Sequence, residues 1–243
     1  RVLMSERRAS AGVGAVELSL SGVIVVNAVA GMLAWLAWRE HRRQLVQRRC
    51  LLDDCSRLFD AQTVTCGGDG FPRIEGILAG RTIDVRLISD GMTIRRLPQL
   101  WLQVTELAAL EMFSGFAVLV RPSGYEFFSL TPRFHHVIDV PPSFPPEVIV
   151  RGEDERSAAN FAGLSALLAS ILSDARVKEI AVTRQGLRII RQADEGRRGE
   201  YLLLRQATFD SPGVSAEVLA HMLRDLDTLR VEAALACREP EAA

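Results

Sequence analysis

Hydrophobic residues form one long uninterrupted run near the amino end of the chain. Residues 18–38 read LSLSGVIVVNAVAGMLAWLAW and contain no ionisable side chain. At about 1.5 Å per residue, a helix of this length covers about 30 Å, the thickness of the hydrocarbon core of a bilayer. The run therefore predicts a single transmembrane helix that follows an N-terminal tail of residues 1–17.

The residues at the end of this run are typical of a membrane–water interface. Trp35 and Trp38 close the run, and Arg39, Arg42 and Arg43 follow almost at once. Indole rings favour the depth of the lipid headgroups, and arginine accumulates beside the ends of membrane helices. We expect these five side chains to lie at the interface.

A cleaved signal peptide is the alternative interpretation of the same run. Arg7 and Arg8 would be its positive region, and residues 28–30 (Ala-Val-Ala) would be its cleavage site. However, Glu17 lies where the apolar region would already be under way, and cleavage would leave a mature chain that starts with apolar residues. A retained membrane anchor fits the pattern better.

Small residues and one amide share a face within the predicted membrane helix. Asn27 and Gly31 are four residues apart, with Ala30 and Ala34 close beside them. Small residues let a second helix approach closely, and an amide in hydrocarbon gains about 0.6–2 kcal/mol from a polar partner. This face predicts packing against other transmembrane subunits, unless Asn27 bonds its own helix backbone, which the sequence leaves equally open.

Flanking charge indicates the orientation of the helix. Three arginines precede the run and five follow it: Arg1, Arg7 and Arg8 against Arg39, Arg42, Arg43, Arg48 and Arg49. Because positive residues accumulate on the cytoplasmic side, the count favours a cytoplasmic location for the large C-terminal part. The four cysteines suggest no disulfide framework, which agrees with a reducing compartment.

The segment after the membrane run keeps apolar residues at helical spacing as far as about Asp60. Because it is rich in arginine, we expect a basic juxtamembrane helix that either lies on anionic headgroups or packs as a stalk on the domain. The glycine-rich residues 65–70 then interrupt the pattern. Residues 39–70 are therefore interpreted as a helix and hinge, with a globular domain from residue 71.

Short runs of strand-forming residues follow one another closely between residues 71 and 150. They are residues 73–78, 82–88, 92–97, 100–107, 116–120, 125–130, 137–140 and 148–150. Parallel pairing needs crossover connections of a dozen or more residues, so the sheet should be mainly antiparallel. The proline-rich and charged residues 141–156 mark either a subdomain boundary or a surface loop.

The C-terminal part alternates helix and strand. Residues 157–173 carry an amphipathic stripe, residues 178–183, 187–192 and 201–209 are strand-like, and Ser211-Pro212 opens a final helix. The whole pattern predicts an α+β domain over residues 71–236, with two helices of the C-terminal half packed on the sheet. Residues 237–243 form a tail.

Composition narrows the classes of function. The chain has 243 residues, 48% of them hydrophobic, and a formal net charge of −1, which gives no basic footprint for nucleic acid. Lys178 is its one lysine and lies in what reads as a turn before a strand. Chemistry that depends on a lysine, including a phosphate-binding loop, is therefore disfavoured.

Catalytic and metal-binding patterns are missing from the sequence. His135 and His136 are adjacent and would point to opposite faces of a strand, and the spacing of Cys50, Cys55 and Cys66 matches no zinc or iron–sulfur pattern. Ser165 lies in a predicted helix and lacks the second glycine of a nucleophile elbow. We expect no catalytic residue, no metal site and no cofactor.

These expectations favour a non-catalytic, single-pass accessory or stabilising subunit of a larger membrane complex. Its partners would be other transmembrane subunits and membrane lipid, without nucleic acid. A bacterial photosynthetic or respiratory complex in the inner membrane is one such setting, and the preference for arginine over lysine suits a GC-rich bacterial genome. The alternatives are an independent membrane-tethered sensor or binding module and an enzyme of unfamiliar type.

Overall fold

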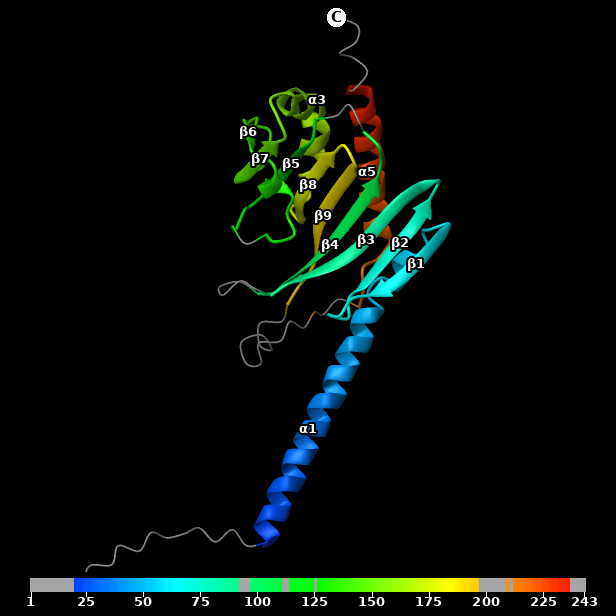
Figure 1. Ribbon diagram of the computed structural model, residues 1–243, viewed down its shortest axis with the longest axis vertical. Coiled ribbons are helices and arrows are strands. Elements are labelled where there is room, and N and C mark those ends of the chain that lie inside the picture. The colour runs from blue at the N-terminus through cyan, green and yellow to red at the C-terminus, as the bar shows by residue number, and fades with distance from the viewer. Residues whose placement is uncertain are drawn as a thin grey trace, which may run out of the picture. The chain divides into compact units, whose positions relative to one another are not determined.

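The structure, a computed structural model, describes residues 20–91, 97–110, 114–124, 126–196, 209 and 212–236 (Figure 1). The chain divides into two compact units, Arg1–Arg43 and Gln44–Ala243, and each is described by itself.

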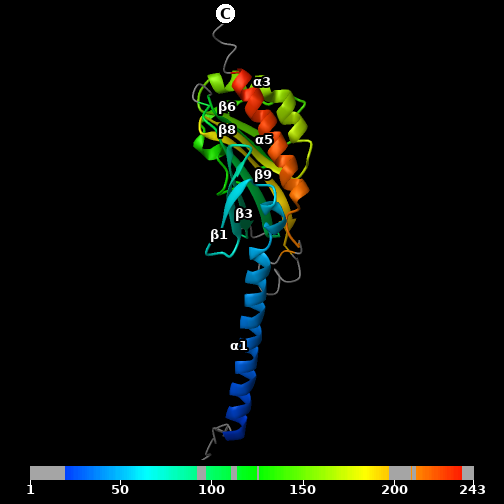
Figure 2. The same ribbon diagram turned by 90° about the vertical axis from the view of Figure 1, so that its right-hand side faces the viewer.

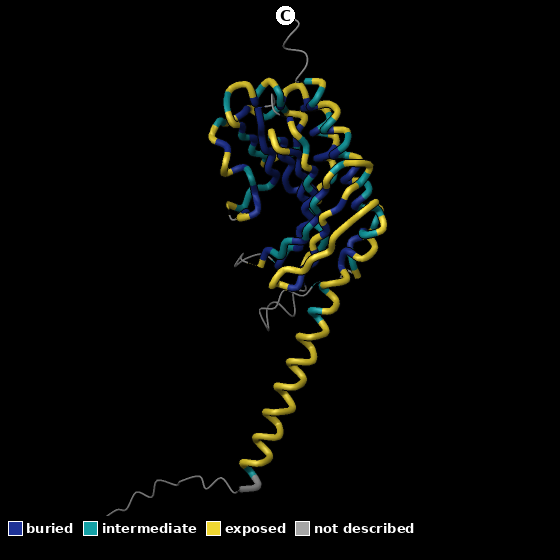
Figure 3. Tube along the Cα trace, turned by 45° about the vertical axis from the view of Figure 1, so that its right-hand side comes forward, coloured by how far each residue is buried: buried dark blue, intermediate teal, exposed yellow. Residues whose placement is uncertain are grey.

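The first unit contains most of helix α1 (Leu20–Arg49). Its described side chains from Val23 to Trp38 are exposed all round the helix, as the tube in Figure 3 shows. Large apolar side chains among them are between 39% and 62% exposed. One helix of the chain is therefore long and apolar enough to cross a membrane, as the sequence predicted.

Helix α1 ends at Arg49, earlier than the helical spacing to Asp60 suggested. Leu51, Leu52 and Cys55 turn inward and are buried in the core of the second unit, and only the short helix α2 (Asp53–Ser56) remains. Strand β1 (Ala61–Cys66) follows. The apolar positions that looked like one continuous stripe therefore belong to two different surfaces, which the periodicity alone does not distinguish.

The glycine-rich residues 67–70 form the turn between two paired strands and lie inside the domain. The amide of Gly70 donates to the carbonyl oxygen of Gly67 over 3.0 Å, and Cys66 pairs with Pro72. The interpretation of this segment as a hinge in front of the domain was therefore wrong, because the domain already includes β1.

Nine strands in the described residues form one antiparallel sheet in the order β1-β2-β3-β4-β9-β8-β5-β7-β6. The others are β2 (Pro72–Leu78), β3 (Arg81–Asp90), β4 (Gln99–Leu107), β5 (Phe116–Val120), β6 (His136–Ile138), β7 (Val148–Gly152), β8 (Val177–Thr183) and β9 (Gly186–Glu195). The antiparallel α+β prediction is confirmed. Pairing of β4 with β9 joins an N-terminal meander to the later strands in one sheet.

Three expected strands differ from the structure or lie largely outside the described residues. Residues 126–130 are irregular, because Glu126 turns back to accept hydrogen bonds from the Ser123 amide and hydroxyl. Residues 92–96 and all of 201–209 except Phe209 lie outside the described residues. Residues 141–147 connect β6 with β7, neighbours in the same sheet, and form a loop whose Phe144 ring packs 5.3 Å from that of Phe161.

Helices α3 (Arg156–Ile171) and α5 (Ala216–Ala236) cover one face of the sheet, which Figure 2 shows from the side. The main core lies between them and the strands. The ring of Phe161 on α3 meets that of Phe116 on β5 at 5.6 Å, and Leu219, Leu226 and Leu229 of α5 are fully buried. The two amphipathic helices thus pack on the sheet through their apolar residues, as the sequence predicted.

The first turn of α5 is capped from a distant part of the chain. The Asp54 carboxylate on α2 accepts a hydrogen bond of 3.0 Å from the Ala216 amide, and the Ser215 hydroxyl accepts one of 3.3 Å from Val218. A carboxylate at a helix N-terminus satisfies a free amide and favours the helix dipole. Asp54 therefore ties α2 to the start of α5.

Replacing Asp54 by alanine should lower the free energy of unfolding of the domain by about 1 kcal/mol, because the Ala216 amide loses its acceptor. Chemical denaturation of the full chain in detergent measures this difference. Arg57→Ala is the matched control, because it removes the 3.6 Å ion pair between exposed Arg57 and Asp54 but leaves the cap in place. Equal destabilisation by both substitutions would contradict the capping role.

Candidate functional site

The predicted interface residues of α1 stack in pairs one helical turn apart. The Arg39 guanidinium carbon lies 5.1 Å from the centre of the Trp35 ring, and that of Arg42 lies 4.9 Å from the centre of the Trp38 ring. Such cation–π contacts hold an indole and a positive charge at one level along the helix. Arg43 instead lies 4.0 Å from exposed Glu40.

The small-residue face of α1 is open within its unit. Apart from its chain neighbours and the adjacent helix backbone, no heavy atom lies within 4 Å of the position that a Cβ on Gly31 would take, and Ala30 and Ala34 are exposed. The Asn27 side-chain amide donates to the Val23 carbonyl oxygen over 2.8 Å, which is the self-bonded arrangement that the sequence left open. Close approach of another helix therefore depends on Gly31 and the alanines more than on the amide, and it stays a prediction.

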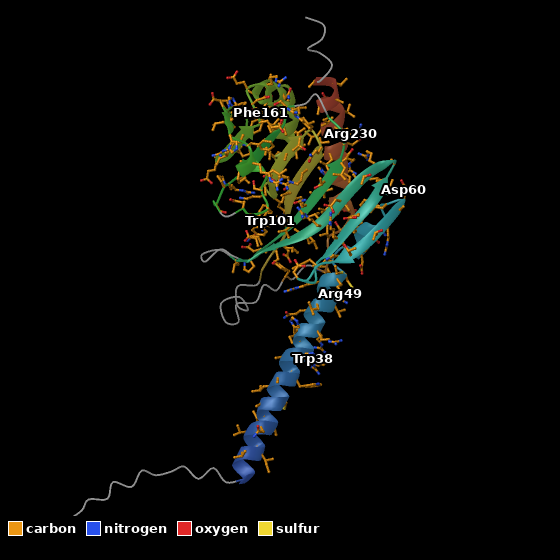
Figure 4. All side chains as sticks on the ribbon, viewed as in Figure 1. Trp38, Arg49, Asp60, Trp101, Phe161 and Arg230 are labelled. Carbon is orange, nitrogen blue, oxygen red and sulfur yellow. The ribbon has the colours of Figure 1, made fainter. Side chains whose placement is uncertain are left out.

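The face of the sheet opposite α3 and α5, named here the second face, carries several buried charged side chains. Residues 121–124 and 126–136 fold over part of this face and include the short 3-10 helix η1 (Thr131–Arg133). The Phe128 ring lies 5.5 Å from that of Trp101 on β4, and Phe134 contacts Ala117 and Ala181. Figure 4 labels Trp101 on the sheet and Arg230 on α5.

Glu179 is the buried centre of this arrangement. Its side chain is 0% exposed, and one carboxylate oxygen accepts a hydrogen bond from Arg188 of the neighbouring strand. The other oxygen accepts from the Ser129 hydroxyl, from the Thr131 hydroxyl at 3.2 Å and from the Leu130 amide at 2.8 Å. Both oxygens of this carboxylate therefore already accept hydrogen bonds from the protein itself.

Lys178 lies beside Glu179 on the second face because β8 contains a bulge. Val177 pairs with Arg191 and Glu179 pairs with Ile190, so Lys178 is the extra residue and both side chains point to the same face. Its ammonium lies 2.8 Å from Glu126, both side chains being 5% exposed, and donates to the Arg121 carbonyl oxygen. The prediction of a turn at Lys178 was wrong, because the residue lies within β8 and residue types alone do not indicate a bulge.

Arginines near Glu179 leave an excess of positive charge. Among the described residues, neither Arg86 on β3 nor Arg133 on η1 has a carboxylate within salt-bridge distance, and Arg86 donates instead to Gln103 over 3.0 Å. Burial lowers the pKa of Arg188, Glu179 opposes this shift, and the positive charges of Arg86 and Arg133 lower that pKa further. The sequence did not predict this arginine cluster because its members come from three separate segments, β3, η1 and β9.

Ion pairs around one buried carboxylate on the other face link α5 to the sheet. Glu106 on β4 is 1% exposed and lies 3.1 Å from both Arg81 and Arg230, and Asp227 also meets both arginines. Burial raises the pKa of Glu106, while the two arginines oppose that change. Because this cluster is balanced in charge and joins three elements, its role is structural.

A groove of about 500 Å³ lies between α3 and α5 and contains one imidazole–carboxylate pair, His221 and Asp225, 3.0 Å apart. No group of three or more histidine, cysteine or acidic side chains in the described parts of the chain is placed to hold a metal ion. Neither a scan against protein-family models nor a search of curated proteins found a match to this chain.

The Lys178–Glu126 pair predicts a specific acid sensitivity. Burial would raise the pKa of Glu126, but hydrogen bonds from Lys178 and Ser123 outweigh it and lower that pKa to about 2, against an ordinary 4.5. The folded state therefore binds the Glu126 proton more weakly than the unfolded state does. Its stabilisation is present above about pH 4.5 and is lost as the pH falls toward 2.

Glu126→Gln should lower the free energy of unfolding near neutral pH by about 3 kcal/mol, because it removes one charge of the buried Lys178–Glu126 ion pair. The variant should also lose less stability than the wild type on acidification. Denaturant titrations across that pH range measure both effects, with Glu232→Gln on exposed α5 surface as the control. An acid dependence equal to that of the wild type would refute the assignment.

Proposed function

We propose that this chain is a non-catalytic, single-pass membrane protein that serves as an accessory or stabilising subunit of a larger membrane complex. The observation that carries the proposal is α1, whose apolar surface is exposed along the whole described stretch before Arg39. An apolar surface of this extent needs lipid or protein around it. Lipid and other transmembrane subunits are therefore the partners of the helix.

The setting proposed is the bacterial inner membrane, with the domain in the cytoplasm. Five arginines follow the apolar run and three precede it, which favours the cytoplasm for the C-terminal side. A photosynthetic or respiratory complex is one setting for such a subunit. The open space at Gly31, beside Ala30 and Ala34, supplies the surface on which a neighbouring helix would pack.

An independent membrane-tethered binding module is the second candidate. The observation that favours it is the excess of arginine on the second face, where Arg86 and Arg133 meet no carboxylate among the described residues. A domain that only stabilises its neighbours needs no such excess. The two candidates differ in whether the purified protein travels with other subunits.

Extraction in mild detergent followed by size exclusion and mass spectrometry separates the candidates. An accessory subunit should elute with other membrane proteins in constant ratio, whereas a tethered module should elute alone. Elution of the pure chain by itself, under conditions that preserve other membrane complexes, would contradict the proposal.

Asn27→Leu combined with Gly31→Leu should weaken that association about 3- to 30-fold, the equivalent of about 0.6–2 kcal/mol, because leucine side chains keep the neighbouring helix away. The measurement is the fraction of the chain that co-elutes with its partners. Val25→Leu combined with Val29→Leu changes the opposite side of the helix and is the matched control. An unchanged co-eluting fraction in the first variant would refute packing through this face.

A further inference from the structure

We propose that the second face carries a binding site for an oxyanion, a carboxylate or phosphate group, held by Arg86, Arg133 and Arg188 beside Trp101. The site lies in the domain and goes beyond the proposed function, because it does not depend on how α1 assembles in the membrane.

The register of the sheet places these groups together. Arg86 pairs with Gln103, Gln103 pairs with Ile190, and Thr105 pairs with Arg188. With strands about 4.8 Å apart and about 3.3 Å per residue along a strand, the backbones of Arg86 on β3 and Arg188 on β9 are roughly 12 Å apart across β4, within reach of two long side chains that converge on one ligand. Trp101 lies on β4 two residues before Gln103, on the same face.

The nearby carboxylates are already committed to other partners. Both oxygens of Glu179 are occupied, one by Arg188 and the other by the hydroxyl and amide groups of the covering segment. Asp84 on β3 accepts a 2.5 Å hydrogen bond from Arg73, which also lies 2.9 Å from Glu75. The charge that remains on Arg86 and Arg133 therefore has no anion within the described part of the domain.

Three buried N–H groups at this place have no acceptor among the residues that the structure describes: Arg86 Nε, Arg188 Nε and Trp101 Nε1. The Arg188 side chain is 8% exposed and Trp101 is 7% exposed, so water reaches neither freely. A buried donor without an acceptor costs about 1–3 kcal/mol. Two of these donors belong to guanidinium groups, whose planar geometry fits carboxylate and phosphate oxygens.

Two of the three arginines are within reach of solvent. Residues 126–136 cover the sheet around Trp101 and Ala181, and Arg133 near their end is exposed. Arg86 on β3 is half-buried. An anion that arrives from solvent meets Arg133 and Arg86 before the deeper Arg188. The oxyanion has two possible sources, a free small anion or an acidic side chain of a partner protein.

Fluorescence of Trp101 reports binding directly. The chain contains three tryptophans, so the full chain with Trp35→Phe and Trp38→Phe retains Trp101 as its only one. Inorganic phosphate and a short glutamate-rich peptide are titrated separately against sodium chloride of equal ionic strength. A saturable change of emission with phosphate identifies the free anion, and one with the peptide alone identifies an acidic partner segment.

Arg86→Gln and Arg133→Gln, each made in this background, should raise the concentration for half saturation at least about tenfold, because each removes a charge-assisted contact. Arg57→Gln, at the exposed residue that follows α2, is the control and should bind as the parent does. Arg133 is exposed, so its variant tests the site even if Arg86→Gln fails to fold. No saturable response beyond that to chloride, or an unchanged response in Arg133→Gln, would overturn the proposal; co-elution with membrane partners would be unaffected.

Discussion

The lack of any charge between residues 18 and 38 is the constraint on which the membrane assignment depends. The backbone of residues 20–38 satisfies its own hydrogen bonds in α1, while the apolar side chains from Val23 to Trp38 are exposed. Each Å² of such surface costs about 25 cal/mol in water, a cost that surrounding lipid or other apolar helices would remove. Trp35 and Trp38 contact Arg39 and Arg42 at the end of the apolar stretch. Such pairs of indole and guanidinium groups are typical of the membrane–water interface.

A second constraint on the domain is the burial of charged residues in strand β8. This strand lies near the centre of the sheet, and six of its seven residues are buried. Two of those residues are the charged Lys178 and Glu179, and a buried charge is tolerated only when it is paired and hydrogen-bonded. Residues 126–131 supply several of these partners, through Glu126, Ser129 and the backbone amide of Leu130. By folding over part of the second face, this segment pairs the buried charges of β8. It also brings Arg133 near Arg86 and Arg188.

The sequence predicted the features that depend on local periodicity: the apolar helix, the antiparallel strands and the two amphipathic helices on the sheet. It did not predict where α1 ends, because Leu51 and Leu52 keep helical spacing while packing into a different core. The Asp54 cap of α5 joins residues 162 apart in the chain, and the bulge at Lys178 shifts a register without changing composition. The sequence likewise did not predict the arginine cluster, because its members come from β3, η1 and β9 and meet only in the folded sheet.

Alkaline carbonate extraction of membranes that contain the full chain tests membrane anchoring most directly, because it strips peripheral proteins and leaves only chains embedded in lipid. The chain should stay in the membrane pellet, and a variant with Val25→Arg and Val29→Arg should move to the soluble fraction, because charges within the hydrocarbon core oppose insertion. Release of the unaltered chain into the supernatant would contradict an embedded α1 and, with it, the role proposed for this protein.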